Sequence, residues 1–224
     1  MTTTLATRRP TTRRAWLVPT GLILLSVIPI IAGAFRLTEL TGGAIPTPQN
    51  TRFLEAPIPI VTHIVSATIF SLLGAFQFVP ALRRRRWRLG SWHRVAGRAL
   101  IAAGLLSALS GLWMAVVYDL PAGDGDALLV LRLVFGTAMV ASIALGLRAI
   151  IRRDFVVHSE WMTRSYAIGV AAGTQPLLLL PSSLFFPLTD ELPRAILMGS
   201  AWVINLAVAE YVIRRRAAVR GVTP

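Results

Sequence analysis

Two histidines lie in similar arginine-rich surroundings and could together bind a haem iron. His93 lies in RRRRWRLGSWHRVAGR, which runs from Arg83 to Arg98, and His158 lies in RRDFVVHSEWMTRSY, which runs from Arg152 to Tyr166. A haem held by two imidazoles needs histidines at matched depth on facing helices, with cations near its propionates. Each histidine comes a few residues before a long apolar segment, so the pair meets the depth requirement. The sequence therefore indicates a b-type haem and membrane electron transfer, with His93 and His158 as axial ligands and Arg94, Arg98, Arg164 and Trp161 around the ring.

A second interpretation of the same residues stays open. His, Trp and Arg are all favoured at the membrane–water interface, where they contact lipid headgroups. In that case the basic loops, above all Arg83 to Arg86, would bind anionic lipid or a cytoplasmic partner, and the protein would be non-enzymatic. If the protein does bind a haem, it would be a membrane oxidoreductase. The sequence contains no hydrolytic motif, phosphate loop or paired-carboxylate site that would indicate another class of enzyme.

The third histidine belongs to a different part of the molecule. His63 precedes Leu82 by 19 residues, which corresponds to about 28 Å of helix. It therefore cannot share a haem with the other two histidines. Arg132 and Gln175 should lie at a similar depth, and an arginine inside a membrane normally faces the bundle interior or water. We expect His63, Arg132 and Gln175 to form an outer polar pocket for a quinone or another small ligand; the alternative is that they only hydrogen-bond one another.

The composition places these residues in a membrane protein. Hydrophobic residues make up 54% of the 224 residues, charged residues only 15%, and the mean hydropathy is +0.64. A net charge of +13 would suggest nucleic acid in a soluble protein. Here the arginines flank apolar segments, so the expected partner is a bilayer with anionic headgroups and not nucleic acid. The absence of cysteine excludes disulfides and thiolate metal sites.

Six segments are long and apolar enough to cross a bilayer, which requires about 20 residues. The expected fold is an all-α integral membrane helical bundle of six transmembrane helices between a basic tail at 1–14 and another at 214–224. The membrane domain is 15–213, and the spans are approximately 15–35, 58–82, 99–118, 127–151, 167–186 and 195–213.

The arginines predict the orientation of these spans. Nineteen of the 23 lie in the tails or in the connections on one side, which the positive-inside rule makes cytoplasmic. Both termini are then cytoplasmic, and the long segment 36–57 on the other side looks irregular. An alternative is that Arg13-Arg14-Ala15-Trp16-Leu17 begins an export signal cleaved near Ala34, which would leave five spans.

Small residues suggest how the helices would pack. Gly97, Gly104 and Gly111 recur every seven residues, and Gly169 and Gly173 form a GxxxG pattern. Glu210 is expected to pair with Arg214 one turn along. The two basic loops also form a faint internal repeat. A third interpretation is a small-molecule transporter built on this repeat, with the helix break at Gln175-Pro176 near its site.

The chain resembles a family of bacterial predicted membrane proteins that is catalogued as a domain of unknown function. The resemblance rests on His63…Gly74-Ala75-Phe76-Gln77-Phe78, on the H-R-x-x-G-R motif at His93 to Arg98, and on H-x-x-W-M-x-R-S-Y-A from His158 to Ala167. It covers roughly Ile58 to Ser200, and Ser159 departs from the basic residue that we expect there. The resemblance implies a multi-pass protein of the bacterial inner membrane and implies no activity.

Overall fold

The structure is a computed structural model that describes residues 12–79, 82, 86–87, 90–121, 123–185 and 190–221. The arginines at 83–85 and 88, which carried part of the lipid-binding interpretation, lie outside the described residues. Seven helices and one pair of short strands are described. They are α1 (Thr12–Thr41), α2 (Thr51–Glu55), α3 (Pro57–Phe76), β1 (Arg86–Trp87), β2 (Gly90–Ser91), α5 (Trp92–Val117), α6 (Asp126–Ile151), α7 (Phe155–Ser182) and α8 (Glu191–Val219).

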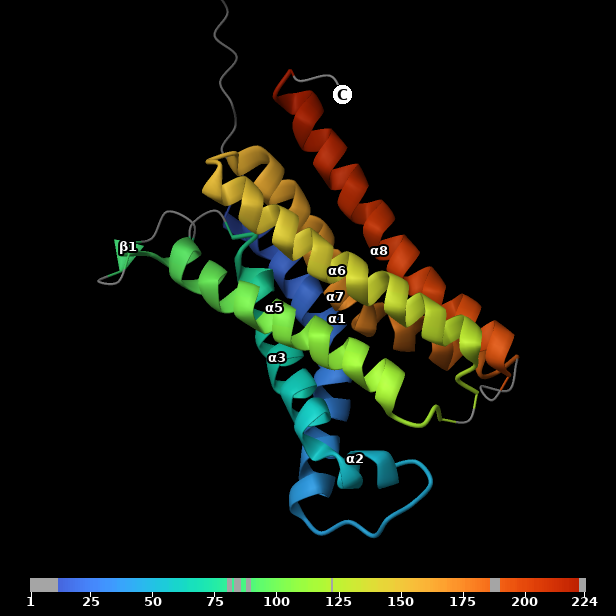
Figure 1. The fold of residues 1–224 in the computed structure, drawn as a ribbon. Coiled ribbons are helices and arrows are strands. Elements are labelled where there is room, and N and C mark those ends of the chain that lie inside the picture. Colours follow the sequence, from blue (N-terminus) through green and yellow to red (C-terminus); the bar gives the residue numbers. More distant parts are fainter. Residues whose placement is uncertain are drawn as a thin grey trace, which may run out of the picture.

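Four long helices surround the core. Helix α3 contacts both α5 and α7, and α6 also contacts both, so α5 and α7 lie diagonally across the group (Figure 1). Short connections make α6 antiparallel to α5 and to α7, and those two helices therefore run in the same direction. Helix α1 packs against α3 and α7, and α8 packs against α6 and α7. The two-residue strands pair antiparallel in the first histidine loop, a small addition to an otherwise helical fold.

Five helices within the described residues are long and apolar enough to span a membrane: α1, α3, α5, α6 and α8. The expected all-α membrane class is confirmed. Helix α7, the counterpart of the span expected at 167–186, has 28 residues but is not among these five. Its residues include Glu160, Arg164 and Gln175, and it contacts α1, α3, α5, α6 and α8. A helix surrounded by other helices does not need the uniformly apolar surface that lipid demands.

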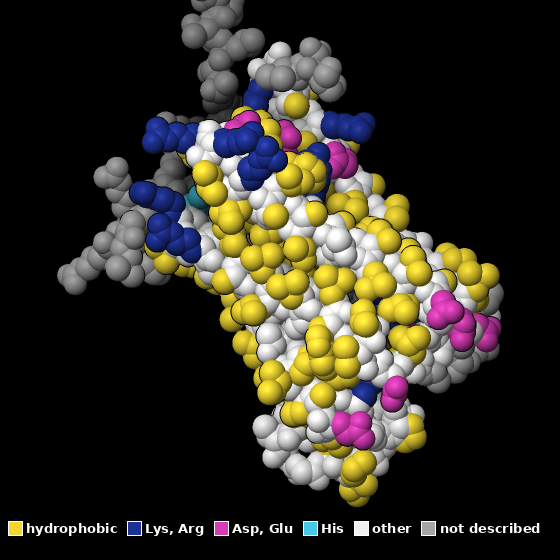
Figure 2. All heavy atoms as spheres, viewed as in Figure 1, with side chains coloured by type: hydrophobic (Ala, Val, Ile, Leu, Met, Phe, Trp, Pro, Cys, Tyr) yellow, Lys and Arg dark blue, Asp and Glu magenta, His cyan; other side chains and the backbone are white. Residues whose placement is uncertain are grey.

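The molecular surface agrees with a lipid environment. Figure 2 shows hydrophobic side chains over the middle of one face and arginines gathered toward one end. Leu24, Val116 and Ile196 are more than half exposed on three different helices. We call the end at which α5 and α7 begin the arginine-rich end. Apolar area of this extent would be unfavourable in water and is expected against acyl chains.

The segment between α1 and α3 is more ordered than the sequence suggested. Helix α1 continues to Thr41, and residues 51–55 form α2. The buried Asn50 organises the loop between them: its amide oxygen accepts a hydrogen bond from Thr47 N at 2.6 Å, and its amide nitrogen donates to Glu39 Oε1 and Ile45 O. The expectation of an irregular segment was therefore wrong for these helical residues, because one side chain satisfies the backbone and fixes α2 in place.

Candidate functional site

A tight corner between α6 and α7 positions His158. Arg153 adopts a left-handed backbone conformation with φ 60°, which stops α6 and turns the chain. Asp154 then caps α7 by accepting a hydrogen bond from Val157 N at 3.0 Å. One turn into α7, His158 lies with Nδ1 2.8 Å from Gly146 O on α6. Because a carbonyl oxygen can only accept, the ring proton lies on Nδ1, and the lone pair of the neutral ring is on Nε2.

His93 is held in a comparable way from the other diagonal helix. It lies in the first turn of α5, and its Nδ1 hydrogen-bonds Oε1 of Gln77, just past the end of α3. An amide oxygen again places the proton on Nδ1 and the lone pair of the neutral ring on Nε2. Histidines that ligate metals are commonly oriented by such a hydrogen bond from the second ring nitrogen. Both imidazoles therefore have the tautomer that an Nε2 ligand requires.

Two glycines that contact a single phenylalanine relate the positions of the two histidines along the bundle. A Cβ placed on Gly104 of α5 would lie 2.8 Å from Cε2 of Phe70, and one on Gly169 of α7 would lie 2.8 Å from Cε1 of the same ring. The two glycines therefore face each other across Phe70. His93 precedes Gly104, and His158 precedes Gly169, by eleven residues each.

Eleven residues of helix rise about 16 Å and turn slightly more than three full times, ending within about 20° of the starting direction. His93 and His158 thus lie on the same helix faces as the two glycines, about 16 Å nearer to the arginine-rich end. On ideal helices, this offset directs both side chains toward the interior of the bundle from diagonally placed, parallel helices. Each of the two helices therefore carries one histidine on the face that is turned toward Phe70, near the arginine-rich end.

The surrounding residues are placed less uniformly. Arg94 and Arg98 are exposed on the first two turns of α5. Trp161 is half-buried, and the guanidinium of Arg164 lies 4.7 Å from the centre of its ring. Arg164 itself forms an ion pair with Glu210 of α8, so it is turned away from the interior that the histidines face. Glu210 was expected to pair with Arg214; its partner is instead this arginine from another helix.

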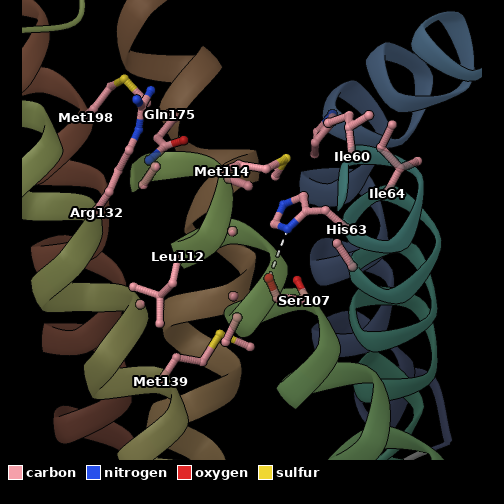
Figure 3. Close-up of a pocket in the computed structure, with 18 of the residues that line it drawn as sticks. Ile60, His63, Ile64, Ser107, Leu112, Met114, Arg132, Met139, Gln175 and Met198 are labelled. Carbon is pink, nitrogen blue, oxygen red and sulfur yellow. Dashed lines mark hydrogen bonds between the residues drawn. The ribbon is translucent and has the colours of Figure 1, made fainter. Parts of the chain in front are cut away.

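His63, Arg132 and Gln175 line one cavity of about 460 Å³ at the end of the bundle away from His93 and His158. Figure 3 shows His63 on one side of it and Arg132 with Gln175 on the other. A Cβ on Gly111 would lie 3.3 Å from Cε1 of His63, and Gly111 follows Gly104 by seven residues. His63 is therefore about 10 Å beyond Phe70, and about 27 Å along the bundle from the other histidines.

A buried carboxylate that the sequence interpretation left out organises one wall of the cavity. Asp124 has a fully buried side chain; Arg132 Nη2 lies 2.5 Å from its Oδ2, and Arg194 Nε lies 2.6 Å from its Oδ1. Two guanidinium groups thus share one carboxylate, which leaves one positive charge uncompensated within this cluster. Asp124 looked like an ordinary acidic residue in a short loop, and its only sequence signal was its position eight residues before an arginine inside a span.

Helix α2 contributes to one end of the cavity. Arg52 and Phe53 are part of the lining, and Arg52 Nη1 donates to Asp119 O at 3.2 Å. Burial lowers the pKa of the Arg52 guanidinium, although an arginine remains charged. The ring of Phe53 lies between Arg36 and Arg52, 4.4 Å and 4.6 Å from their guanidinium carbons. These contacts hold α2 beside the cavity.

Within the described residues, no group of three or more His, Asp or Glu side chains is arranged to hold a metal ion. A haem iron is a different case, because four of its ligands come from the porphyrin and the protein needs to supply only two.

Comparison with known proteins adds the family and nothing about activity. A family model described as predicted membrane protein (DUF2306) matches residues 60–213. No curated protein and no solved structure matches the chain.

Proposed function

The chain belongs to the DUF2306 family of predicted membrane proteins, and we propose that this member binds one b-type haem between His93 and His158 and carries single electrons within the membrane. The proposal includes α7 as a sixth membrane-embedded helix and places the arginine-rich end and both termini in the cytoplasm of a bacterial cell.

One observation carries the proposal: both histidines lie eleven residues before a glycine that contacts the same Phe70 ring. Equal offsets from a common reference give equal depth, and nearly whole helical turns give a common facing direction. Interfacial histidines that only contact headgroups would have no reason to point into the bundle from diagonal helices. The paired Nδ1 hydrogen bonds support the same conclusion.

Each surrounding group would have a defined part in holding the cofactor. Gln77 and Gly146 would keep the two imidazole rings oriented through Nδ1. Phe70 and Tyr166, whose ring centres are 5.6 Å apart, would form the apolar floor of the site. The cations for the propionates would be Arg94 and Arg98, which lie on the first two turns of α5 beside His93. A haem in this position would supply reversible one-electron chemistry.

The visible spectrum of protein purified from haem-replete cells tests the proposal. We expect a Soret band that is lost in His93→Ala and in His158→Ala. The matched control is His63→Ala, which removes the third histidine of the chain and should leave the band intact. A second variant, His158→Met, should retain haem with a higher reduction potential, because methionine is also an axial ligand and raises that potential.

Folding is followed in parallel by size-exclusion chromatography and helix content. A folded wild-type protein without a Soret band would overturn the proposal. So would folded alanine variants at both positions that keep the band unchanged.

The exposed arginines favour a second candidate function, binding of anionic lipid at the arginine-rich end. Arg214, Arg215 and Arg220 are exposed near the end of α8, and Figure 1 shows that this helix continues past the corner between α6 and α7. Such a cluster attracts anionic headgroups whether or not the protein binds haem.

A further inference from the structure

The cavity on the other side of Phe70 has a composition that selects a class of ligand. Its volume of about 460 Å³ is within the range of sites that enclose a small organic molecule. Leu112, Met114 and Met139 form much of the wall between its polar sides (Figure 3). Methionine side chains adapt to flat or irregular ligands. The occupant should therefore have an apolar middle and polar groups at two separate edges.

The His63 side offers a hydrogen-bond acceptor. Nδ1 of His63 lies 2.9 Å from Ser107 O, and a backbone carbonyl can only accept, so Nδ1 carries the proton. The Ser110 hydroxyl donates to Leu106 O at 2.6 Å and can only accept from the imidazole. The neutral ring then presents the lone pair of Nε2, and Figure 3 shows the imidazole directed from α3 toward Met114. A ligand at this side must supply a donor, such as a hydroxyl group.

The opposite side offers donors. Arg132 uses one guanidinium nitrogen for Asp124, and a guanidinium carries five N–H donors in all. Gln175 lines the cavity beside it, and its side chain makes no hydrogen bond within the part of the chain that the structure describes. The amide of Gln175 can therefore donate to an oxygen of a ligand. A ligand at this side must therefore supply an oxygen acceptor.

We propose that the cavity binds a lipid-soluble hydroquinone, with one ring hydroxyl donating to Nε2 of His63 and the oxygen at the opposite ring position accepting from Arg132 and Gln175. A hydroquinone has a donor and an acceptor on opposite edges of an apolar ring, as the two sides of the cavity require. A fatty acid has oxygens at one end only and would leave His63 without its donor. The cluster of Asp124 with two arginines fixes Arg132 while adding one net positive charge near the accepting oxygen.

This inference extends the proposed electron-transfer function, because a hydroquinone is a membrane-soluble reductant, but the binding itself does not require the haem. The two sites lie on opposite sides of Phe70, with Tyr166 packed against the same ring. The cavity and the haem site can therefore be tested separately on one protein sample.

The test measures binding of reduced decylubiquinone, and of laurate as a single-ended competitor, to the full-length protein in detergent. We expect saturable binding of the hydroquinone that is weakened about tenfold or more by His63→Phe and by Gln175→Leu, since each removes one buried hydrogen bond. The matched control is Thr174→Val, a neighbour on α7 whose hydroxyl donates to Asn205 and is not part of the cavity lining. It should leave the affinity within about twofold of wild type.

Three outcomes would overturn the inference. One is the absence of saturable binding by folded wild-type protein. Another is unchanged affinity in both His63→Phe and Gln175→Leu. The third is binding of laurate as tight as that of the hydroquinone and insensitive to His63→Phe, which would make the cavity a carboxylate site. The Soret band of the same samples keeps the two proposals distinct, because failure of hydroquinone binding with the band present contradicts only the cavity assignment.

Discussion

Arg164 on α7 makes a two-point ion pair with Glu210 on α8, with Nε 2.5 Å from Oε1 and Nη2 3.1 Å from Oε2. The side chains are 22% and 35% exposed, so the pair lies largely between the helices. Planar, two-point pairing of this kind is stronger and more directional than a single contact. It fixes α8 against α7 near the arginine-rich end, at the level of the adjacent Trp161 ring.

Breaking this pair should destabilise the protein. Glu210→Gln leaves Arg164 partly buried without its counterion, and we expect a loss of about 1–3 kcal/mol in the free energy of unfolding. The measurement is denaturant-induced unfolding in detergent. Arg214→Gln is the control, because Arg214 is exposed and should contribute little. Equal losses from both variants would contradict the assignment of Arg164 as the principal partner of Glu210.

The wrong expectation for Glu210 shows what local sequence can predict. An i,i+4 pair with Arg214 follows from helical spacing alone, whereas the pair with Arg164 joins residues 46 positions apart. Asp124 was missed for the same reason, since its two arginine partners come from α6 and α8. The lengths of the apolar segments predicted the helices, because each segment by itself must be long enough to cross the hydrocarbon core. Partners between helices depend on packing, which spacing along one helix does not determine.

The glycine patterns were informative only in part. Gly104 and Gly111 do meet other helices, through Phe70 and His63, but a Cβ on Gly97 would meet nothing within 4 Å. The expected spans also did not show that α7 would contact every other long helix. Its GxxxG pattern has a definite use, because Gly169 accommodates Phe70 and Gly173 accommodates the backbone of α1. Small residues mark positions at which contact is allowed, and the topology decides which of them are used.

Gly173 offers a direct test of how α1 packs. A Cβ at this position would lie 2.1 Å from the backbone oxygen of Leu25, and a backbone cannot move aside as a side chain can. Gly173→Ala should therefore push α1 away from α7 and cost about 2–3 kcal/mol of stability. The matched control is Gly97→Ala, which has open space and should be neutral or slightly stabilising because alanine is the better helix former.

Thermal unfolding midpoints of both variants check this prediction. If the two alanine substitutions behave alike, the close approach of α1 to Gly173 is wrong.

Asp124 should contribute far more to the free energy of unfolding than the nearby Asp126 does. Its buried carboxylate neutralises part of the charge on Arg132 and Arg194. Asp124→Asn would leave two partly buried guanidinium groups close together without a carboxylate, and we expect a loss of about 3 kcal/mol. Asp126→Asn is the matched control: Asp126 is exposed in the first turn of α6, where removing its charge should cost about 0.5 kcal/mol.

Unfolding in detergent compares these two carboxylate variants, and hydroquinone binding by Asp124→Asn should weaken in parallel because Arg132 loses its fixed position. A stable Asp124→Asn protein would show that the two arginines find other partners and that the cluster does not organise the cavity.

The arginines near the end of α8 should bind anionic lipid through charge and not through a shaped site. Three of them, Arg214, Arg215 and Arg220, are exposed. Each arginine close to an anionic surface contributes about 1 kcal/mol, so replacing all three by glutamine should weaken binding of phosphatidylglycerol about a hundredfold. The corresponding triple lysine variant keeps the charge and should bind as wild type does. Native mass spectrometry of the detergent-solubilised protein, titrated with phosphatidylglycerol at increasing ionic strength, measures the effect. Binding that is lost in the lysine variant, or that does not weaken with salt, would instead require the planar guanidinium groups to form a specific headgroup site.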